Sequence, residues 1–362
     1  MKRKKIALFD PYLDVLGGGE KHILSIIKAI SENADIDIFW DKNIYKDIQT
    51  RLNITFSTDP TFKNNIFHNK QNIIQKFNSL KGYDYFFYVT DGSYFFSSAK
   101  NNYIFCMIPD KKLYKLNLFN KLKTSNYNFI SNSEFTKKWL NNWGIKSTII
   151  YPYIDSTFTK YEISEVKKEK IILSVGRFFK HLHSKRQDVL VETFIQLKKT
   201  NKLFSDYKLI LAGGVKKEDE DYFSSIKKIG GNDKSIIFKP NISFKDLYEL
   251  YKKSQIFWHI SGFEVDEMKN PEMAEHFGLS PLEAMAMGCI TFAYNAGGLK
   301  ETIENGKNGF LFDTTNELIK KTSDVISNEA LSNEIRKVAK LDVIKKFSYS
   351  TFIKNVLSVV NK

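Results

Sequence analysis

Short apolar runs alternate with amphipathic stretches along almost the whole chain, and this alternation limits the fold more than any other feature. In the first half the apolar runs include KIALF, DIDIFW, DYFFYV and NYIFCMI, and helical spacing appears in EKHILSIIKAISEN and SEFTKKWLNNW. The order strand, helix, strand is typical of a parallel sheet that is covered by helices on both faces. We therefore predict a doubly wound α/β fold.

The alternation begins again after the polar stretch STFTKYEISEVKKEK, residues 156–170. Here the apolar runs IILSVG, YKLILAGG, IFWHIS and CITFAY are separated by helical patterns such as QDVLVETFIQLKK and PLEAMAMG. A chain of 362 residues is also longer than one ordinary core requires. We interpret the polar stretch as a linker and predict two domains, residues 1–160 and 161–345, followed by a helix over residues 346–362.

The cysteines and the amino terminus indicate the compartment. No run in the sequence approaches the roughly 20 apolar residues that span a bilayer. The apolar part of MKRKKIALFD stops at Asp10, which is too short for an export signal. Cys106 and Cys289 lie in apolar runs far apart, as expected of reduced thiols. We expect a cytoplasmic protein that at most rests on the inner face of the cytoplasmic membrane.

The net charge of +14 is concentrated in the first half of the chain. Residues 1–150 hold 22 Lys/Arg against 13 Asp/Glu, whereas the remaining residues hold 33 against 28. This excess favours an anionic partner, for which a membrane leaflet, a phosphate-bearing acceptor and nucleic acid are the alternatives. It is equally typical of lysines that only keep the surface solvated. The lysines are dispersed and accompany no helix-turn-helix or RNP-like motif, which argues against nucleic acid.

Glycine-rich loops after the predicted strands indicate a phosphate site. GGG at residues 17–19 opens the first helix, and LAGG ends a strand of the second half. SVGRFFKHLHSKRQD adds Arg177 and Lys185, with Arg186 as the alternative to Lys185. The carboxyl ends of parallel strands meet at one edge of a sheet, where helix N-termini present free amides to an anion. These loops together suit a diphosphate.

The segment EHFGLSPLEAMAMG, residues 275–288, places two carboxylates eight positions apart. Ser280, Pro281 and Glu283 have the order of a capping box at the start of a helix, which would explain Glu283. Glu275 serves no such cap. The glycine three residues after it would let a ligand approach the backbone closely. Capping therefore explains neither Glu275 nor this glycine.

These motifs resemble the family 4 glycosyltransferases of the GT-B fold. The resemblance rests on GGGEKHILSI, ISNSEFTKKWL, IIYPYID, SVGRF with SKRQDVLVETF, LAGG and above all EHFGLSPLEAMAMGCITFAYNAGGLKETIENGKNGFLF, and it extends to at least Asp313. It implies two facing Rossmann-like domains with the donor in the cleft between them, and a last helix that crosses back onto the first domain. It also implies a retaining transfer.

From this resemblance we expect a metal-independent glycosyltransferase without a cofactor. Its donor would be a UDP-, GDP- or dTDP-sugar and its acceptor a glycan linked to a lipid, in the synthesis of a cell-surface polysaccharide or oligosaccharide. An anionic membrane surface is an expected partner, and nucleic acid is not.

The resemblance also implies roles for individual residues. Arg177 and Lys185 would hold the donor diphosphate, whose charge grows as the glycosidic bond breaks. Glu275 would bind sugar hydroxyls, and Glu283 would bind those of the ribose. The catalytic set would be Glu275, Arg177 and Lys185. The expected donor site comprises Gly18, Gly19, Arg177, Lys185, Gly213, Gly278, Leu279, Ser280 and Glu283.

One position departs from the family pattern. The family often has a histidine two residues before a proline at the end of a first-domain strand, and FCMIPDKK places Met107 there. His22 or Asp110 could take its role on the acceptor side. The alternatives are a histidine that caps the helix or faces solvent and an ordinary loop aspartate. A catalytically impaired glycan- or nucleotide-sugar-binding protein is therefore a further interpretation, as is a GT-B epimerase or phosphorylase.

Metal ligands are not expected. A metal-dependent GT-A transferase needs an Asp-x-Asp where a strand ends, but Asp35–Asp37 begins one. Glu218–Asp221 lies among lysines, where we expect solvated surface. His181 and His183 have no further ligands at zinc spacing.

Overall fold

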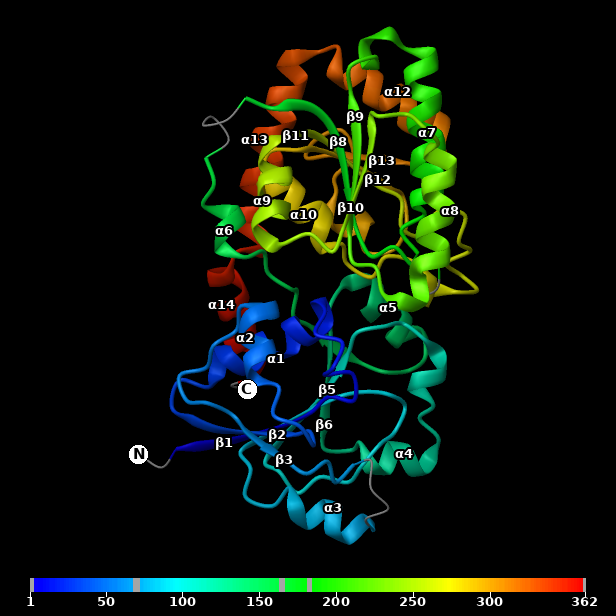
Figure 1. Ribbon diagram of the computed structural model, residues 1–362. Helices are drawn as coiled ribbons and strands as arrows, with labels where there is room; N and C mark the ends of the chain where they lie inside the picture. The colour runs from blue at the N-terminus through cyan, green and yellow to red at the C-terminus, as the bar shows by residue number, and fades with distance from the viewer. Residues whose placement is uncertain (1–2, 68–71, 163–166, 181–183, 361–362) are drawn as a thin grey trace. The chain divides into compact units, whose positions relative to one another are not determined.

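The computed structural model describes residues 3–67, 72–162, 167–180 and 184–360. The chain divides into two compact units, with the bounds Met1–Tyr153 plus Ser350–Lys362 for the first and Ile154–Tyr349 for the second. Each unit contains a parallel sheet with helices packed around it (Figure 1). The predicted α/β class with two Rossmann-like units is confirmed.

The sheet of the first unit has the strand order β3-β2-β1-β4-β5-β6-β7. The chain moves outward from β1 to β3 and then returns to the other side of β1 at β4, so the strand order reverses between β1 and β4. Leu8 on β1 pairs with Ile38 on one side and Phe87 on the other. The strands are β1 Lys4–Phe9, β2 Ala34–Phe39, β3 Thr61–Lys63, β4 Tyr85–Val89, β5 Asn101–Cys106, β6 Tyr127–Ser131 and β7 Ser147–Ile149.

The last helix belongs to the first unit. On β5, the Tyr103 hydroxyl donates to the carbonyl of Val360 at 3.2 Å, and the Phe352 and Tyr153 rings lie 4.9 Å apart. The expected return of this helix to the first unit is confirmed. The helices of this unit are α1 Gly18–Ile30, α2 Tyr45–Leu52, α3 Ile73–Ser79, α4 Leu118–Lys123, α5 Glu134–Asn142, α14 Tyr349–Val360 and the 3₁₀ helix η1 Lys111–Tyr114.

The second unit repeats this topology with the strand order β10-β9-β8-β11-β12-β13. Its order reverses between β8 and β11, which pair in parallel. The loops that follow these two strands therefore flank the place where sheets of this kind bind ligands. The strands are β8 Glu169–Val175, β9 Lys208–Gly213, β10 Ile236–Pro240, β11 Ser254–His259, β12 Ile290–Tyr294 and β13 Phe310–Phe312.

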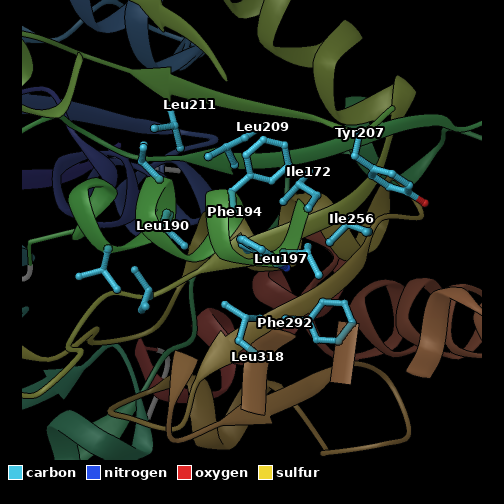
Figure 2. Packing of buried hydrophobic residues seen from close by; sticks show 14 of the residues in the cluster. Ile172, Leu190, Phe194, Leu197, Tyr207, Leu209, Leu211, Ile256, Phe292 and Leu318 are labelled. Atoms are coloured by element: carbon cyan, nitrogen blue, oxygen red, sulfur yellow. The ribbon is translucent and has the colours of Figure 1, made fainter. Parts of the chain in front are cut away.

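A continuous apolar core holds the second unit together. Figure 2 shows Leu190, Phe194 and Leu197 of α7 among side chains of the sheet such as Leu209 and Ile256. Each such side chain contributes about 1.5–3 kcal/mol by its burial. The helices of this unit are α6 Ser156–Thr159, α7 Gln187–Thr200, α8 Glu220–Gly230, α9 Phe244–Lys253, α10 Leu279–Ala286, α11 Leu299–Thr302, α12 Thr315–Ile326, α13 Glu329–Phe347, with 3₁₀ helices η3 Lys202–Phe204, η4 Lys217–Asp219 and η5 Pro271–Met273.

The interpretation of residues 156–170 as a linker needs correction. Its first residues form α6, and Phe158 is 2% exposed with its ring edge-on to that of Tyr251, at 5.7 Å between centroids. The few apolar residues of this polar stretch form no clear periodic pattern, yet Phe158 is buried in the second unit. The units divide after Tyr153. Residues 163–166 lie outside the described part.

Candidate functional site

Helix α10 begins earlier than the capping pattern predicts. Its first residue is Leu279, and Gly278 before it has a φ of 95°, a left-handed conformation that glycine adopts without strain. Ser280 therefore lies inside the helix, where its hydroxyl donates to the carbonyl of Val175 at 3.3 Å. The predicted capping box is wrong, because glycine geometry turns the chain into the helix and the serine ties α10 to β8. Gly288 follows the helix with a φ of 76°, the left-handed conformation that is common just after a helix.

Glu283 is oriented by α9 rather than by a cap. The hydroxyl of Tyr251 donates to its Oε2 at 2.9 Å. Burial, followed by the negative charge of Glu283, raises the pKa of Tyr251, so the phenol stays protonated and keeps donating. Glu283 itself is only partly buried, near the middle of α10.

Glu275 lies at the centre of a polar cluster in the loop between η5 and α10. Its Oε2 contacts the Nζ of Lys185 and lies 2.9 Å from the Nε2 of His259. Lys185 also donates to the hydroxyl of Ser261 at 3.3 Å. The side chains of Lys185 and Glu275 are each 15% exposed, so both charges are compensated but within reach of a ligand. The structure thus joins two of the predicted catalytic residues.

His259 was missed by the sequence analysis, although it ends the buried strand β11. Its ring is 1% exposed, and burial lowers its pKa against the opposing effect of its hydrogen bond to Glu275. A neutral imidazole that bonds to a carboxylate through Nε2 must carry its proton there. His259 therefore donates to Glu275 and fixes the orientation of that carboxylate. The only sequence signal was a histidine within the apolar run IFWHIS.

Two close approaches of backbone hold the cluster in place. A Cβ on Gly297, which has a φ of 58°, would lie 2.0 Å from the carbonyl oxygen of Glu275, and the amide of Gly298 donates to that oxygen at 2.7 Å. On the other side, a Cβ on Gly176 would lie 2.5 Å from the Cγ of Lys185. Gly297 after β12 therefore leaves room for the backbone of Glu275, and Gly176 after β8 leaves room for the side chain of Lys185.

Arg177 follows β8 and is the more accessible of the two predicted cations. Its side chain is 43% exposed, and its guanidinium carbon lies 4.4 Å from the centre of the Phe179 ring. A terminal nitrogen lies 3.8 Å from Asp219, which is 6% exposed. The expectation of solvated surface at residues 218–221 is therefore wrong for Asp219, because it lies beside Arg177 just before α8.

Two further residues of the sequence analysis, Gly213 and Arg186, lie near this loop. A Cβ on Gly213 would lie 2.0 Å from the carbonyl oxygen of Gly176, so the two strand ends touch through backbone. Arg186, the alternative to Lys185, lies 3.2 Å from Asp188 and 3.4 Å from Glu264. It is Lys185 and not Arg186 that contacts Glu275.

All of these groups flank the reversal of strand order in the second sheet. Arg177 and Lys185 follow β8, His259 ends β11, and Glu275 follows β11 directly before α10. The first turn of α10 adds backbone amides and a partial positive charge. Two cations, these amides and an oriented carboxylate suit a ligand that carries both phosphate and hydroxyl groups.

The corresponding place in the first unit is chemically different. Gly18 and Gly19 open α1, and a Cβ on Gly19 would lie 2.1 Å from the sulfur of Met107. His22 is 3% exposed and edge-on to Phe105 at 4.9 Å, and burial lowers its pKa to about 3. This position favours a packing role for His22.

Two aspartates of the first unit, Asp110 and Asp10, have different surroundings. Asp110 caps η1 by accepting from the amide of Lys112 at 2.9 Å. Asp10, which the sequence analysis did not single out, directly follows β1 and is 1% exposed. Burial, with the charge of Glu20 adding to it, raises its pKa to about 8. Its Oδ1 accepts from the amide of Tyr12 at 2.9 Å, while its Oδ2 has no hydrogen-bond partner among the described residues.

Among the described residues, no group of three or more His, Cys, Asp or Glu residues is arranged to hold a metal ion. Asp35 pairs with Arg3 at 2.8 Å, and Asp37 pairs with Lys63 at 2.7 Å. His181 and His183 lie outside this part of the chain. None of the described helices combines the length and apolarity that crossing a membrane requires.

Comparison with known proteins gives three results. Residues 155–342 match the family described as glycosyl transferases group 1. A GDP-Man:Man(3)GlcNAc(2)-PP-Dol alpha-1,2-mannosyltransferase of Xenopus laevis is 32% identical over 227 residues, which are 59% of this chain and 43% of that protein. The chain thus spans less than half the length of this curated relative.

Two solved structures share the fold over the whole chain. A glycosyltransferase from Rickettsia africae superposes with a TM-score of 0.74 at 17% identity, covering 100% of this chain and 98% of its own. The Anabaena protein HepE, solved in complex with UDP, superposes with a TM-score of 0.75 at 16% identity, covering 99% of both chains. These similarities concern the fold, and they agree with the GT-B class predicted from the sequence.

Proposed function

Since this chain belongs to the group 1 glycosyl transferases, we propose that it transfers a sugar from a nucleotide-sugar donor to a lipid-linked glycan. The observation that carries the proposal is the cluster of Lys185, Glu275 and His259 beside the amides of α10. The Xenopus relative supports it, because its name gives GDP-Man as one substrate and a glycan on PP-Dol as the other. HepE was solved with UDP, so the base of the donor stays open.

The donor diphosphate would lie between the loop after β8 and the start of α10. Arg177 is exposed enough to meet a phosphate, and its planar guanidinium can form two parallel hydrogen bonds. Lys185 and the first-turn amides of α10 would complete the positive surroundings. The charge on the leaving diphosphate grows as the bond to the sugar breaks, so these contacts strengthen in the transition state.

Glu275 would hold the sugar. Without a donor, its carboxylate and the Lys185 ammonium neutralise each other at 15% exposure. A bound donor would separate the Lys185–Glu275 ion pair, because its phosphate would attract the ammonium and its sugar hydroxyls would donate to the carboxylate. His259 keeps the carboxylate oriented during the exchange. An anion beside the ring also becomes more favourable as the ring carbon turns cationic.

Glu283 would bind the ribose of the donor. Its Oε2 accepts from the buried Tyr251, and a carboxylate has further acceptor sites for two neighbouring hydroxyls. Because Tyr251 restrains the side chain, little rotational freedom is lost when the ribose binds.

We propose that the transfer retains the anomeric configuration and needs no metal. The bond between the anomeric carbon and the phosphate oxygen would break, and the acceptor oxygen would bond to that carbon from the same side. The acceptor proton would pass to the departing phosphate oxygen, so no protein base is required at the position of Met107. Arg177 and Lys185 would neutralise the departing charge. A lipid-linked acceptor would bring the reaction to a membrane surface, for which we propose the inner face of the cytoplasmic membrane.

A panel of nucleotides tests the donor site. UDP, GDP and dTDP, with their sugar conjugates, are added to the protein in EDTA, and the melting temperature is measured. The matching nucleotide should stabilise the native state by about 2.7 kcal/mol at a hundredfold excess over its Kd. Arg177→Gln should weaken this binding at least about tenfold, since a charged hydrogen bond contributes roughly 1.5–3 kcal/mol. Lys199→Gln on α7 is the control. A melting curve that no nucleotide moves contradicts the proposal.

Met107 favours a second candidate function, a protein that binds a nucleotide-sugar without transferring it. The sulfur of Met107 fills the space over Gly19, where the family often presents a histidine. Transfer of labelled sugar from the donor selected by the panel to extracted lipid-linked glycans distinguishes the two candidates. Binding without transfer to any acceptor lipid favours the second.

A further inference from the structure

The first unit exposes apolar side chains on two short helices. In the described part of the chain, α3 and α4 bury none of their side chains. They are seven and six residues long, yet they carry six of the 13 large apolar side chains that the described residues expose. Single exposed apolar residues are normal, whereas a group of them marks an interaction surface. The six are Ile73, Ile74, Phe77, Leu118, Phe119 and Leu122.

The two helices are walls of one pocket of about 340 Å³. They lie near each other at one side of the first unit, α3 in cyan and α4 in teal (Figure 1). Lys76 of α3 and Lys123 of α4 both line the pocket, together with the loop after β4. Each ammonium lies over an aromatic ring, Lys76 over Phe95 at 5.4 Å and Lys123 over Phe119 at 4.6 Å. Apolar and cationic groups therefore share this surface.

The charge of this surface has one sign. Residues 72–83 and 111–126 hold seven lysines and no Asp or Glu. Burial, followed by the charge of Lys123, lowers the pKa of Lys76, which means that the two ammonium groups repel each other across the pocket. An anion between them would relieve this repulsion. The lysines, all exposed or half-buried, are Lys76, Lys81, Lys111, Lys112, Lys115, Lys121 and Lys123.

We propose that this α3–α4 surface docks the protein on an anionic membrane leaflet. The apolar side chains enter the boundary between headgroups and acyl chains, and a lipid phosphate binds between Lys76 and Lys123. A helix with an apolar face and lysines beside it is suited to such a boundary. A second copy of this chain is disfavoured as the occupant, because two such faces would bring their lysines together.

This surface deepens the proposed function. The choice of a membrane rests on the proposed lipid-linked acceptor, whereas the binding itself does not depend on sugar transfer. Measurement of vesicle binding therefore separates the two proposals. A protein that binds vesicles but no nucleotide would keep the docking surface and lose the proposed function.

Vesicle sedimentation tests the surface. The parent protein should bind phosphatidylcholine vesicles that contain phosphatidylglycerol, and bind less well without that lipid or at higher salt. Lys76→Gln with Lys123→Gln should weaken binding about 25-fold, since each lysine near such a leaflet contributes roughly fivefold. Leu118→Ser with Leu122→Ser should weaken it at least about tenfold.

Matched controls lie outside the surface. Lys46→Gln on α2 removes an exposed lysine of the same unit, and Leu341→Ser on α13 removes an apolar side chain that is 67% exposed. Both should bind vesicles as the parent does, and melting curves establish that every variant is folded. The proposal is overturned if the parent does not bind anionic vesicles, or if both double variants bind as the parent does. It is also overturned if the leucine variant instead halves the mass in sedimentation equilibrium, which identifies a second copy as the occupant.

Discussion

The two units share one sheet topology but differ at the place where their strand order reverses. In the second unit this place carries charges in contact, with Lys185 on Glu275 and Arg177 near Asp219. At the corresponding place of the first unit, burial raises the pKa of Asp10 to about 8, so this carboxyl group is mostly protonated at neutral pH, and Met107 covers Gly19. Topology thus determines where a site lies, and the side chains at the strand ends decide what it binds.

The largest effect should come from the backbone contact that carries Glu275. Gly297→Ala places a Cβ 2.0 Å from the Glu275 carbonyl at a φ of 58°, so we expect a loss of about 3 kcal/mol of unfolding free energy together with donor binding. Gly306→Ala is the matched control. Its φ is 80°, but a Cβ there meets open space among the described residues, so about 1 kcal/mol should be lost. Equal losses would show that the contact with Glu275 is unimportant.

Removing the charge of Glu275 should have the second-largest effect, and it should act mainly on turnover. Glu275→Gln keeps the size and should lower kcat about a hundredfold, the scale for one well-placed electrostatic contact in a transition state. It also leaves Lys185 without its carboxylate, so about 1–3 kcal/mol of stability should be lost as well. Kinetics with the selected donor and thermal melting measure both. Full turnover in this variant would make Glu275 structural and remove the central difference between the units.

The stability of the protein should depend on pH through Asp10 of the first unit. Because burial raises its pKa from 3.8 to about 8, the native state binds a proton that the unfolded chain releases. The stabilisation is complete below pH 4 and is lost as the pH rises to about 8. The slope approaches roughly 1.4 kcal/mol per pH unit in between.

Asp10→Asn is neutral at every pH and can still accept from the amide of Tyr12. Melting temperatures measured from pH 5 to pH 9 should therefore vary less with pH than those of the parent. If the melting temperatures of the variant and the parent changed equally with pH, Asp10 would be ionised in the native state.

The smallest effect should come from the glycine that faces Met107. A Cβ on Gly19 would meet the flexible end of Met107, which can rotate away at a cost of about 0.5–1.5 kcal/mol. Alanine regains roughly 1 kcal/mol through its higher helix propensity. Gly19→Ala should therefore change the unfolding free energy by less than about 1 kcal/mol. If Gly19→Ala lost as much unfolding free energy as Gly297→Ala, both units would require glycine at these positions.

The sequence by itself predicted the elements whose burial is periodic. The runs KIALF and CITFAY correspond to β1 and β12 within two residues at each end, because strands buried on both faces need continuous apolar side chains. The helices α3 and α4 were not predicted. They bury no side chains in the described part of the chain, and each begins at an asparagine cap, Asn72 or Asn117. A helix without a buried face leaves no periodic pattern to detect.

For the site, the sequence determined which chemical groups are present, and only the tertiary structure decided which of them meet. Arg177, Lys185, Glu275 and Glu283 could be named from their motifs. The contact of Lys185 with Glu275 joins residues 90 positions apart, which meet where β8 lies beside β11, and the ring of His259 contacts a carboxylate that lies 16 positions further along the chain. Burial then decides which groups carry charge, since the cost of an ion in the interior depends on everything packed around it. That surrounding is assembled by folding, which is why no local pattern revealed a protonated Asp10 or a neutral His259.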